Sequence, residues 1–152
     1  PEINTKEQAE NLAKACRYYP EGNRGVCRFV RAAEYFKLAN ENVTVIAHLE
    51  GVEGVNNLDD ILGVEGIDVL FIGPNDLSQT MGIPGQVDHP ELIAKMISIV
   101  KQAEVKGKLV GTFVETPEVA KDWIRRGVKY ISYSVDVGLI LAKFNSIVQA
   151  VF

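Results

Sequence analysis

The sequence contains few of the features that would set it apart from an ordinary globular domain. Its only cysteines are Cys16 and Cys27, and their spacing matches neither a metal-binding pair nor a redox motif. We therefore expect two reduced thiols in a cytoplasmic protein, and a disulfide between them is the alternative. No apolar run approaches the length of a membrane-spanning helix, so we expect no membrane partner.

A surplus of charge of one sign is also missing. The 16 basic and 20 acidic residues give a net charge of −4, and the basic residues are scattered along the chain. That distribution argues against a nucleic-acid partner. No glycine-rich dinucleotide loop opens a predicted helix, and there is no Walker-type sequence, so nucleotide binding is disfavoured as well.

What the sequence does contain is an alternation of β-rich runs with amphipathic segments. Strands are predicted at residues 43–50, 67–73, 108–114 and 128–134. Helices are predicted from a cap at Asn4 or Thr5 to Cys16, and at 31–41, 58–62, 89–107, 117–126 and 137–151. This order is typical of a parallel α/β fold. Four strand–helix units are too few for an eight-stranded barrel of about 250 residues, so we expect either an open doubly wound sheet or half of a barrel.

Two acidic residues follow consecutive predicted strands. Glu50 ends the first strand, and Asp76 comes shortly after the second. Ligands of α/β folds bind at the carboxyl ends of parallel strands, and carboxylate oxygens suit a hard divalent cation. The alternative is that Glu50 caps a helix and Asp76 is a plain loop acid. Position alone leaves both interpretations open.

Four segments occur in the order and spacing of the HpcH/HpaI aldolase family: residues 17–25 (RYYPEGNRG), 48–50 (HLE), 73–78 (GPNDLS) and 134–136 (SVD). The chain resembles this family, which comprises the 4-hydroxy-2-oxoheptanedioate and 2-dehydro-3-deoxyglucarate aldolases, over nearly its whole length. The resemblance implies a (β/α)8 TIM barrel. Residues 1–152 would be the C-terminal half of that single domain, strands five to eight with their helices, and the N-terminal half would be absent. This would account for an opening helix without a strand and for a first residue other than Met.

The resemblance also implies a chemistry. Glu50 and Asp76 would bind Mg²⁺, Mn²⁺ or Co²⁺, and the metal would hold pyruvate. Gly73, Pro74, Asn75 and Asp76 would border the pyruvate carboxylate, with backbone amides of the last two as donors. The activity implied is a class II aldolase, a carbon–carbon lyase that reversibly cleaves a 4-hydroxy-2-oxo acid to pyruvate and an aldehyde. A bound cation suits this reaction because negative charge builds up on the oxygen of an enolate.

His48 departs from the family, which has a substrate-contacting glutamine at this position. The histidine could donate a hydrogen bond to the substrate, ligate the metal, alter specificity, or be a structural residue. The catalytic histidine and the pyruvate-binding arginine of the family lie in the first half of the barrel, so no catalytic residue is assigned here. The alternative functions are a non-catalytic half-barrel fragment or split subunit, and a citrate-lyase-like or malyl-thioester lyase, which would need a coenzyme A site.

Two expectations concern surfaces. The last helix of the family packs against a neighbouring subunit, and apolar positions of residues 137–151 cover more than one helix face. We therefore expect a homo-oligomer formed through this helix; the alternative is a helix pressed into its own domain on two sides. We also expect residues of the barrel interior to be exposed in the chain as given. The residues assigned to that interior are Val69, Phe71, Val110 and Ile131.

Overall fold

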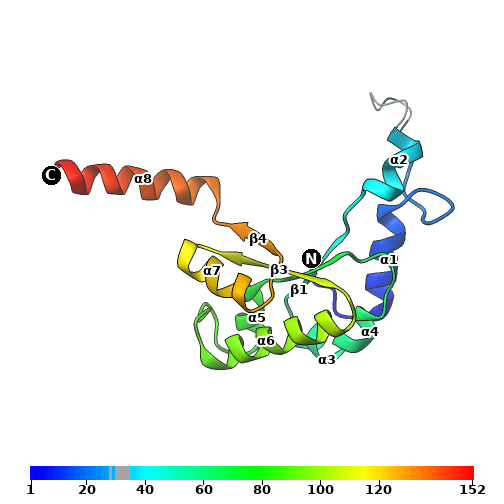
Figure 1. Ribbon diagram of the computed structural model, residues 1–152, viewed down its shortest axis with the longest axis horizontal. Coiled ribbons are helices and arrows are strands. Elements are labelled where there is room, and N and C mark those ends of the chain that lie inside the picture. Colours follow the sequence, from blue (N-terminus) through cyan, green and yellow to red (C-terminus); the bar gives the residue numbers. More distant parts are fainter. Residues whose placement is uncertain (28, 30–34) are drawn as a thin grey trace.

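The computed structural model describes residues 1–27, 29 and 35–152. Figure 1 shows its elements in chain order: α1 (Lys6–Cys16), α2 (Tyr35–Asn42), β1 (Ile46–Leu49), α3 (Val52–Asn56), α4 (Leu58–Leu62), β2 (Val69–Ile72), α5 (Pro74–Thr80), α6 (Pro90–Val105), β3 (Leu109–Val114), α7 (Pro117–Arg125), β4 (Tyr130–Tyr133) and α8 (Asp136–Val151). The four predicted strands are confirmed. Residues 31–34 of the predicted second helix lie outside the described residues. The short helices α3 and α5 were not predicted.

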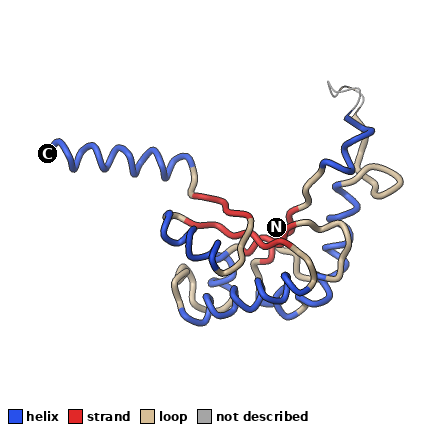
Figure 2. The backbone as a smooth tube through the Cα atoms, viewed as in Figure 1, coloured by secondary structure: helices blue, strands red, loops and turns tan. Residues whose placement is uncertain are grey.

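The strands form one parallel sheet in the order β1-β2-β3-β4, which confirms the α/β class. Helices α3 to α7 lie on one side of this sheet (Figures 1 and 2). An open doubly wound sheet has helices on both faces, so that alternative does not describe the chain. A sequential strand order with helices on one side is the arrangement of neighbouring units in a barrel wall.

The core lies between the sheet and these helices. Alternate strand residues face the helices because side chains in a strand alternate between the two faces. The buried strand residues of this layer are Ala47, Leu49, Leu70, Ile72, Val110, Thr112 and Val114, and their helical partners in the same cluster include Ile61, Leu77, Leu92, Met96, Ile99 and Trp123. Burial of this set is the main source of the stability of the fold.

The prediction that barrel-interior residues are exposed is wrong for the residues chosen. Val69, Phe71 and Val110 are only 3%, 8% and 3% exposed. Val110 and Ile131 belong to the helix-facing layer, because the register aligns Val110 with Leu70. For these two residues the error is one of phase, since a shift of one residue moves a side chain to the other face. Val69 and Phe71 lie on the open face as predicted but are buried there.

The open face of the sheet is lined largely by rings. It borders a hollow of about 330 Å³, whose lining residues are Ile46, His48, Phe71, Phe113, Tyr130 and Ser132. Phe71 is buried even on this face because His48 stacks on it, with ring centroids 4.7 Å apart, and Tyr130 meets it edge-on at 6.0 Å.

Local signals in the sequence fix the helix ends. Thr5 and Gln8 form the expected capping box at the start of α1. Pro117 occupies the first turn of α7, and Gly107 follows α6 with a φ of +70°, a left-handed conformation that glycine adopts without strain. His89 caps the start of α6 through its side chain. These helix boundaries are confirmed.

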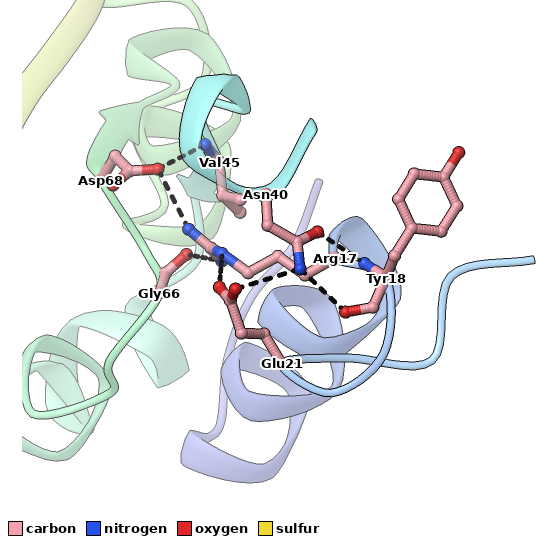
Figure 3. Close-up of polar contacts among 7 residues, drawn as sticks. All are labelled: Arg17, Tyr18, Glu21, Asn40, Val45, Gly66 and Asp68. Atoms are coloured by element: carbon pink, nitrogen blue, oxygen red, sulfur yellow. Dashed lines mark hydrogen bonds and ion pairs between the residues drawn. The ribbon is translucent and has the colours of Figure 1, made fainter. Parts of the chain in front are cut away.

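Arg17 fastens α1 to the amino end of the sheet (Figure 3). Its guanidinium donates to the Gly66 carbonyl at 2.7 Å and lies 3.7 Å from a carboxylate oxygen of Asp68. The same Asp68 oxygen accepts the Val45 N–H at 2.7 Å. The arginine therefore joins α1 to the chain that enters β1 and β2.

The segment 17–25 is held by a second set of contacts, of which Figure 3 shows the bonds between Tyr18 and Asn40. The side chain of Asn40 accepts the Tyr18 N–H at 2.8 Å and donates to the Tyr18 carbonyl at 2.9 Å, which ties this segment to α2. The guanidinium of Arg24 lies over the rings of Tyr18 and Tyr35, and a hydrogen bond to Tyr35 raises the pKa of Arg24. Cys16 and Cys27 are both free, as expected.

Helix α8 projects away from the rest of the chain (Figure 1). The structure describes all of its residues, and none of them is buried. Leu141 is 61% and Phe144 is 64% exposed. Within the described part of the chain, no helix combines the length and apolar character needed to cross a membrane.

Candidate functional site

Glu50 stands directly after β1, where the chain turns into α3. It is only 9% exposed, and both of its carboxylate oxygens have protein neighbours. Oε1 accepts the Glu2 N–H at 2.7 Å, and Oε2 lies 3.5 Å from His48 Nδ1. The N-cap of α3 is Gly51, without a side-chain capping bond. The alternative in which Glu50 caps a helix is therefore wrong, and its carboxylate is fixed in a position beyond the end of the strand.

Asp76 lies in the first turn of α5, which starts at once after β2. Gly73 is the N-cap without a side-chain bond, and Pro74 takes the first helical position. The alternative in which Asp76 is a plain loop acid is therefore wrong: proline at the first helical position needs no N–H donor, and an acid in the first turn interacts favourably with the helix dipole. Asn75 and Asp76 are exposed, whereas Leu77, one residue on, is buried and anchors the helix to the core.

The two carboxylates approach the same point in space. A β-carbon added to Gly73 would lie 2.7 Å from Glu50 Oε2 and 3.7 Å from Asp76 Oδ2. The absence of a side chain at Gly73 therefore leaves open the space that both acids face. Two carboxylates that face one space can both provide oxygen ligands to a cation placed there.

The acid pair fits a small divalent cation. Hard cations of this kind take oxygen ligands, and Mg²⁺ commonly uses one or two carboxylates and fills its other positions with water or substrate oxygens. In the described residues, no group of three or more histidine, cysteine or acidic side chains is arranged to hold a metal. A cation here would thus keep several positions free. The pair also borders an open cavity of about 260 Å³ together with Glu2 and Gln79.

His48 lies on the open face of the sheet, next to this pair. Register places His48, Phe71, Gly111 and Tyr130 in one row across the four strands. A β-carbon on Gly111 would come within 2.8 Å of Tyr130 Cδ1 and 2.9 Å of Phe71 Cδ2, so only glycine lets the two rings meet. Phe71 of this row thus packs against one face of the His48 ring, and Nδ1 of His48 faces Glu50.

Glu2 is a site residue that sequence reasoning missed. Its N–H donates to the Glu50 carboxylate, and the N–H of the next residue, Ile3, donates to the His48 carbonyl at 2.9 Å. The first residues therefore run along the end of β1. A backbone donor has no side-chain signature, and three residues are too few to show a strand pattern, so no signal in the sequence could have identified this contact.

Comparison with known proteins decides the family. The model of the HpcH/HpaI aldolase/citrate lyase family matches residues 1–142. The chain belongs to this family. The family prediction made from the four sequence segments is confirmed.

Relatives within the HpcH/HpaI family are aldolases by name. A 5-keto-4-deoxy-D-glucarate aldolase of Shigella boydii serotype 18 is 34% identical over 145 residues, covering 91% of this chain and 56% of the relative. A hydroxypyruvate/pyruvate aldolase of Roseobacter denitrificans is 34% identical over 154 residues, covering 97% of this chain and 60% of the relative.

The family likeness extends to three dimensions. A crystal structure of an HpcH/HpaI aldolase/citrate lyase family protein from Burkholderia cenocepacia J2315 matches with a TM-score of 0.91 at 30% identity, covering 98% of this chain and 62% of that one. The chain thus spans less than two thirds of the length of each of these three proteins.

Proposed function

We propose that this chain is part of a metal-dependent aldolase, a carbon–carbon lyase that reversibly cleaves a 4-hydroxy-2-oxo acid to pyruvate and an aldehyde. The observation that carries the proposal is the approach of Glu50 and Asp76 to one point beside Gly73. Membership of the HpcH/HpaI family and the aldolase names of the relatives support it.

In this proposal Glu50 and Asp76 hold Mg²⁺, Mn²⁺ or Co²⁺. Such a cation, when bound, acts as a Lewis acid toward the oxygen on which negative charge develops. The Glu2 N–H and the nearby His48 ring keep the Glu50 carboxylate in one orientation, which lowers the cost of ordering it when the metal binds.

The chain also provides a place for the 2-oxo acid. The first N–H groups of a helix have no acceptor within the helix, so those of Asn75 and Asp76 are directed outward at the start of α5. We assign them to the pyruvate carboxylate. Gly73 and Pro74 leave the approach unobstructed, and His48 borders the substrate from the neighbouring strand.

We further propose that the chain supplies strands five to eight of a (β/α)8 barrel. The sequential parallel sheet with helices on one side and the ring-lined open face support this arrangement. The share of the relatives that the chain covers supports it too. The catalytic histidine and the arginine expected from the family would then belong to the remaining strands. We expect the whole protein to be cytoplasmic.

Helix α8 is proposed to join two subunits of a homo-oligomer. Its apolar residues point in several directions and none is buried within the described chain. A second copy offers the cover that this surface requires.

Two alternatives remain distinct from the aldolase proposal. A citrate-lyase-like or malyl-thioester lyase is favoured by the family description, which includes citrate lyase. A non-catalytic half-barrel or split subunit is favoured by the length of the chain relative to its relatives. The first would act on a thioester substrate, and the second would show no lyase activity.

The test uses the full-length protein with Glu50→Gln and Asp76→Asn, and with Glu118→Gln as the control, an exposed acid in the first turn of α7. Mn²⁺ affinity is followed by electron paramagnetic resonance, and pyruvate release from 4-hydroxy-2-oxo acids by a coupled assay. Both site variants should lose Mn²⁺ affinity and at least about 100-fold in kcat, while the control keeps both.

Three results would contradict the proposal in different ways. Unchanged Mn²⁺ affinity in both site variants would exclude the metal site. Cleavage of a malyl or citryl thioester, with no pyruvate from hydroxy-oxo acids, would favour the citrate-lyase-like alternative. Metal binding without any lyase activity in the wild type would favour the non-catalytic one.

A further inference from the structure

Ser78 ends the GPNDLS segment, and nothing in the proposed mechanism yet uses it. Its side chain is fully buried, at 0% exposure. The hydroxyl donates to the Asn75 carbonyl at 2.6 Å and accepts the Gly85 N–H at 2.9 Å. A serine hydroxyl has a single proton to donate, so the hydroxyl hydrogen is committed to Asn75.

The acceptor of that proton belongs to the peptide group that precedes Asp76. Because a peptide is planar, the Asn75 carbonyl and the Asp76 N–H point in opposite directions within one rigid unit. A hydrogen bond to the carbonyl fixes the direction of the N–H. It also polarises the peptide, which strengthens the N–H as a donor.

The Gly85 contact extends this unit to the loop between α5 and α6. Gly82 and Gly85 have φ values of +77° and +74°, and the Ile83 N–H donates to the Ser78 carbonyl at 3.0 Å. The loop is therefore folded back onto Ser78 by its backbone. Hydrogen bonds run in sequence from the Gly85 N–H through the Ser78 hydroxyl to the Asn75 carbonyl.

We propose that Ser78 is a positioning residue for 2-oxo-acid binding: through these two hydrogen bonds it orients the Asn75–Asp76 peptide, whose N–H receives the carboxylate of the substrate. The inference rests on the proposed aldolase function and adds a residue that touches neither substrate nor metal. It separates carboxylate binding from metal binding, because Ser78 acts on a backbone amide and not on the carboxylates of Glu50 and Asp76.

Thr80 on the same helix provides a matched control. Its hydroxyl also donates to the carbonyl three residues before it, Leu77, at 3.1 Å, and accepts the Val52 N–H at 3.2 Å. The Leu77 carbonyl belongs to the Leu77–Ser78 peptide, two residues further into the helix and beyond the first turn. Thr80→Val removes the same kind of bonds from a residue that borders the cavity beside Glu50 and Asp76 but does not bond the Asn75–Asp76 peptide, so it controls for a general effect on α5 and on this cavity.

The experiment measures Mn²⁺ and pyruvate binding separately in the full-length protein, by electron paramagnetic resonance and by calorimetry in saturating Mn²⁺. Ser78→Ala should raise the Kd for pyruvate about tenfold and leave the Kd for Mn²⁺ within about twofold. Ser78→Thr, which keeps the hydroxyl, should stay within about threefold of wild type for pyruvate, and Thr80→Val should match wild type. The Gly85 amide should exchange its hydrogen faster in Ser78→Ala. If Ser78→Ala does not fold, Ser78→Cys, with a slightly larger side chain and only a weak donor, should shift pyruvate binding in the same direction.

Each other outcome counts against a specific part of the argument. Wild-type pyruvate affinity in Ser78→Ala, or an equal loss of Mn²⁺ and pyruvate affinity, would overturn the role of Ser78 while the aldolase proposal stands. An equal pyruvate defect in Thr80→Val would show a general effect of helix stability and overturn it as well. A wild type that binds Mn²⁺ but no pyruvate would overturn the proposed function, and the role of Ser78 with it.

Discussion

Helices α6 and α8 have 16 residues each and both are rich in apolar side chains, yet their surroundings are opposite. Five residues of α6 are buried against the sheet: Leu92, Met96, Ile99, Val100 and Ala103. They recur at helical spacing and form a single face. No residue of α8 is buried, and its apolar side chains point in several directions. A high apolar content therefore indicates that a helix is buried against a partner. Only the spacing of its apolar residues indicates whether they form one face that a single sheet can bury.

The largest effect is expected from charging α8. Leu141→Glu combined with Phe144→Glu places two carboxylates on its exposed apolar surface, which would have to be desolvated against a second subunit. We expect the full-length protein to dissociate into monomers, measured by light scattering. Val105→Glu, at an 85% exposed position at the end of α6, is the control and should leave the mass unchanged. An unchanged mass in the double variant would mean that α8 packs within its own subunit.

A pair of isoleucines compares the two helices directly. Ile99 in α6 is 0% exposed and Ile147 in α8 is 45% exposed. Ile99→Ala should lower the free energy of unfolding by about 2–5 kcal/mol, since it removes a fully buried side chain from the core. In the dissociated Leu141→Glu/Phe144→Glu protein, where α8 has no partner subunit, Ile147→Ala should lower it by less than about 1 kcal/mol. Urea unfolding of both variants in that background measures the difference, and equal losses would show that α8 contributes to the same core as α6.

A substitution at Gly111 tests whether the rings of Phe71 and Tyr130 pack tightly against each other on the open face of the sheet. A β-carbon there would meet Tyr130 Cδ1 at 2.8 Å and Phe71 Cδ2 at 2.9 Å. Gly111→Ala should therefore lower the free energy of unfolding by about 1–3 kcal/mol, because the two rings must separate. Gly25→Ala has no atom within 4 Å of its new β-carbon and should be close to neutral. Thermal unfolding of the two variants would show no difference if the rings can shift freely.

The smallest effect concerns α7, whose exposed face carries ion pairs where α8 has apolar residues. Hydrogen bonds from Arg126 and then Arg125 hold the pKa of Asp122 below its ordinary value. Stability from this carboxylate is present above the unfolded pKa of about 3.9 and is lost as the pH falls through the lower folded value. Asp122→Asn should thus lower the Tm slightly at pH 7, and the difference from wild type should shrink on acidification below pH ~4. A constant difference from pH 7 to strong acid would assign the effect to shape and not to charge.

Part of the candidate site could be predicted from the sequence because it depends on strand ends. Glu50 and Asp76 each follow an apolar run, and parallel strands place such residues at one edge of a sheet. The proline that marks the start of α5 was equally visible, yet no helix was predicted at the GPNDLS segment because α5 has only 7 residues, too few for a clear apolar period. The phase of β3 and β4 was misjudged for a similar reason, since buried strands with apolar residues on both faces show no alternation.

The sequence by itself determined the order of the four strands and of the helices other than α3 and α5, several helix caps, the parallel α/β class and, through four short segments, the family. Those features depend on local spacing and on residues near one another in the chain. Only the tertiary structure decided that the Glu2 N–H holds Glu50, that Gly111 lets Phe71 meet Tyr130, and that Gly73 leaves open the space between the two acids. These contacts join separate strands and backbone groups, and the distance between two such groups depends on how the whole sheet and its helices pack.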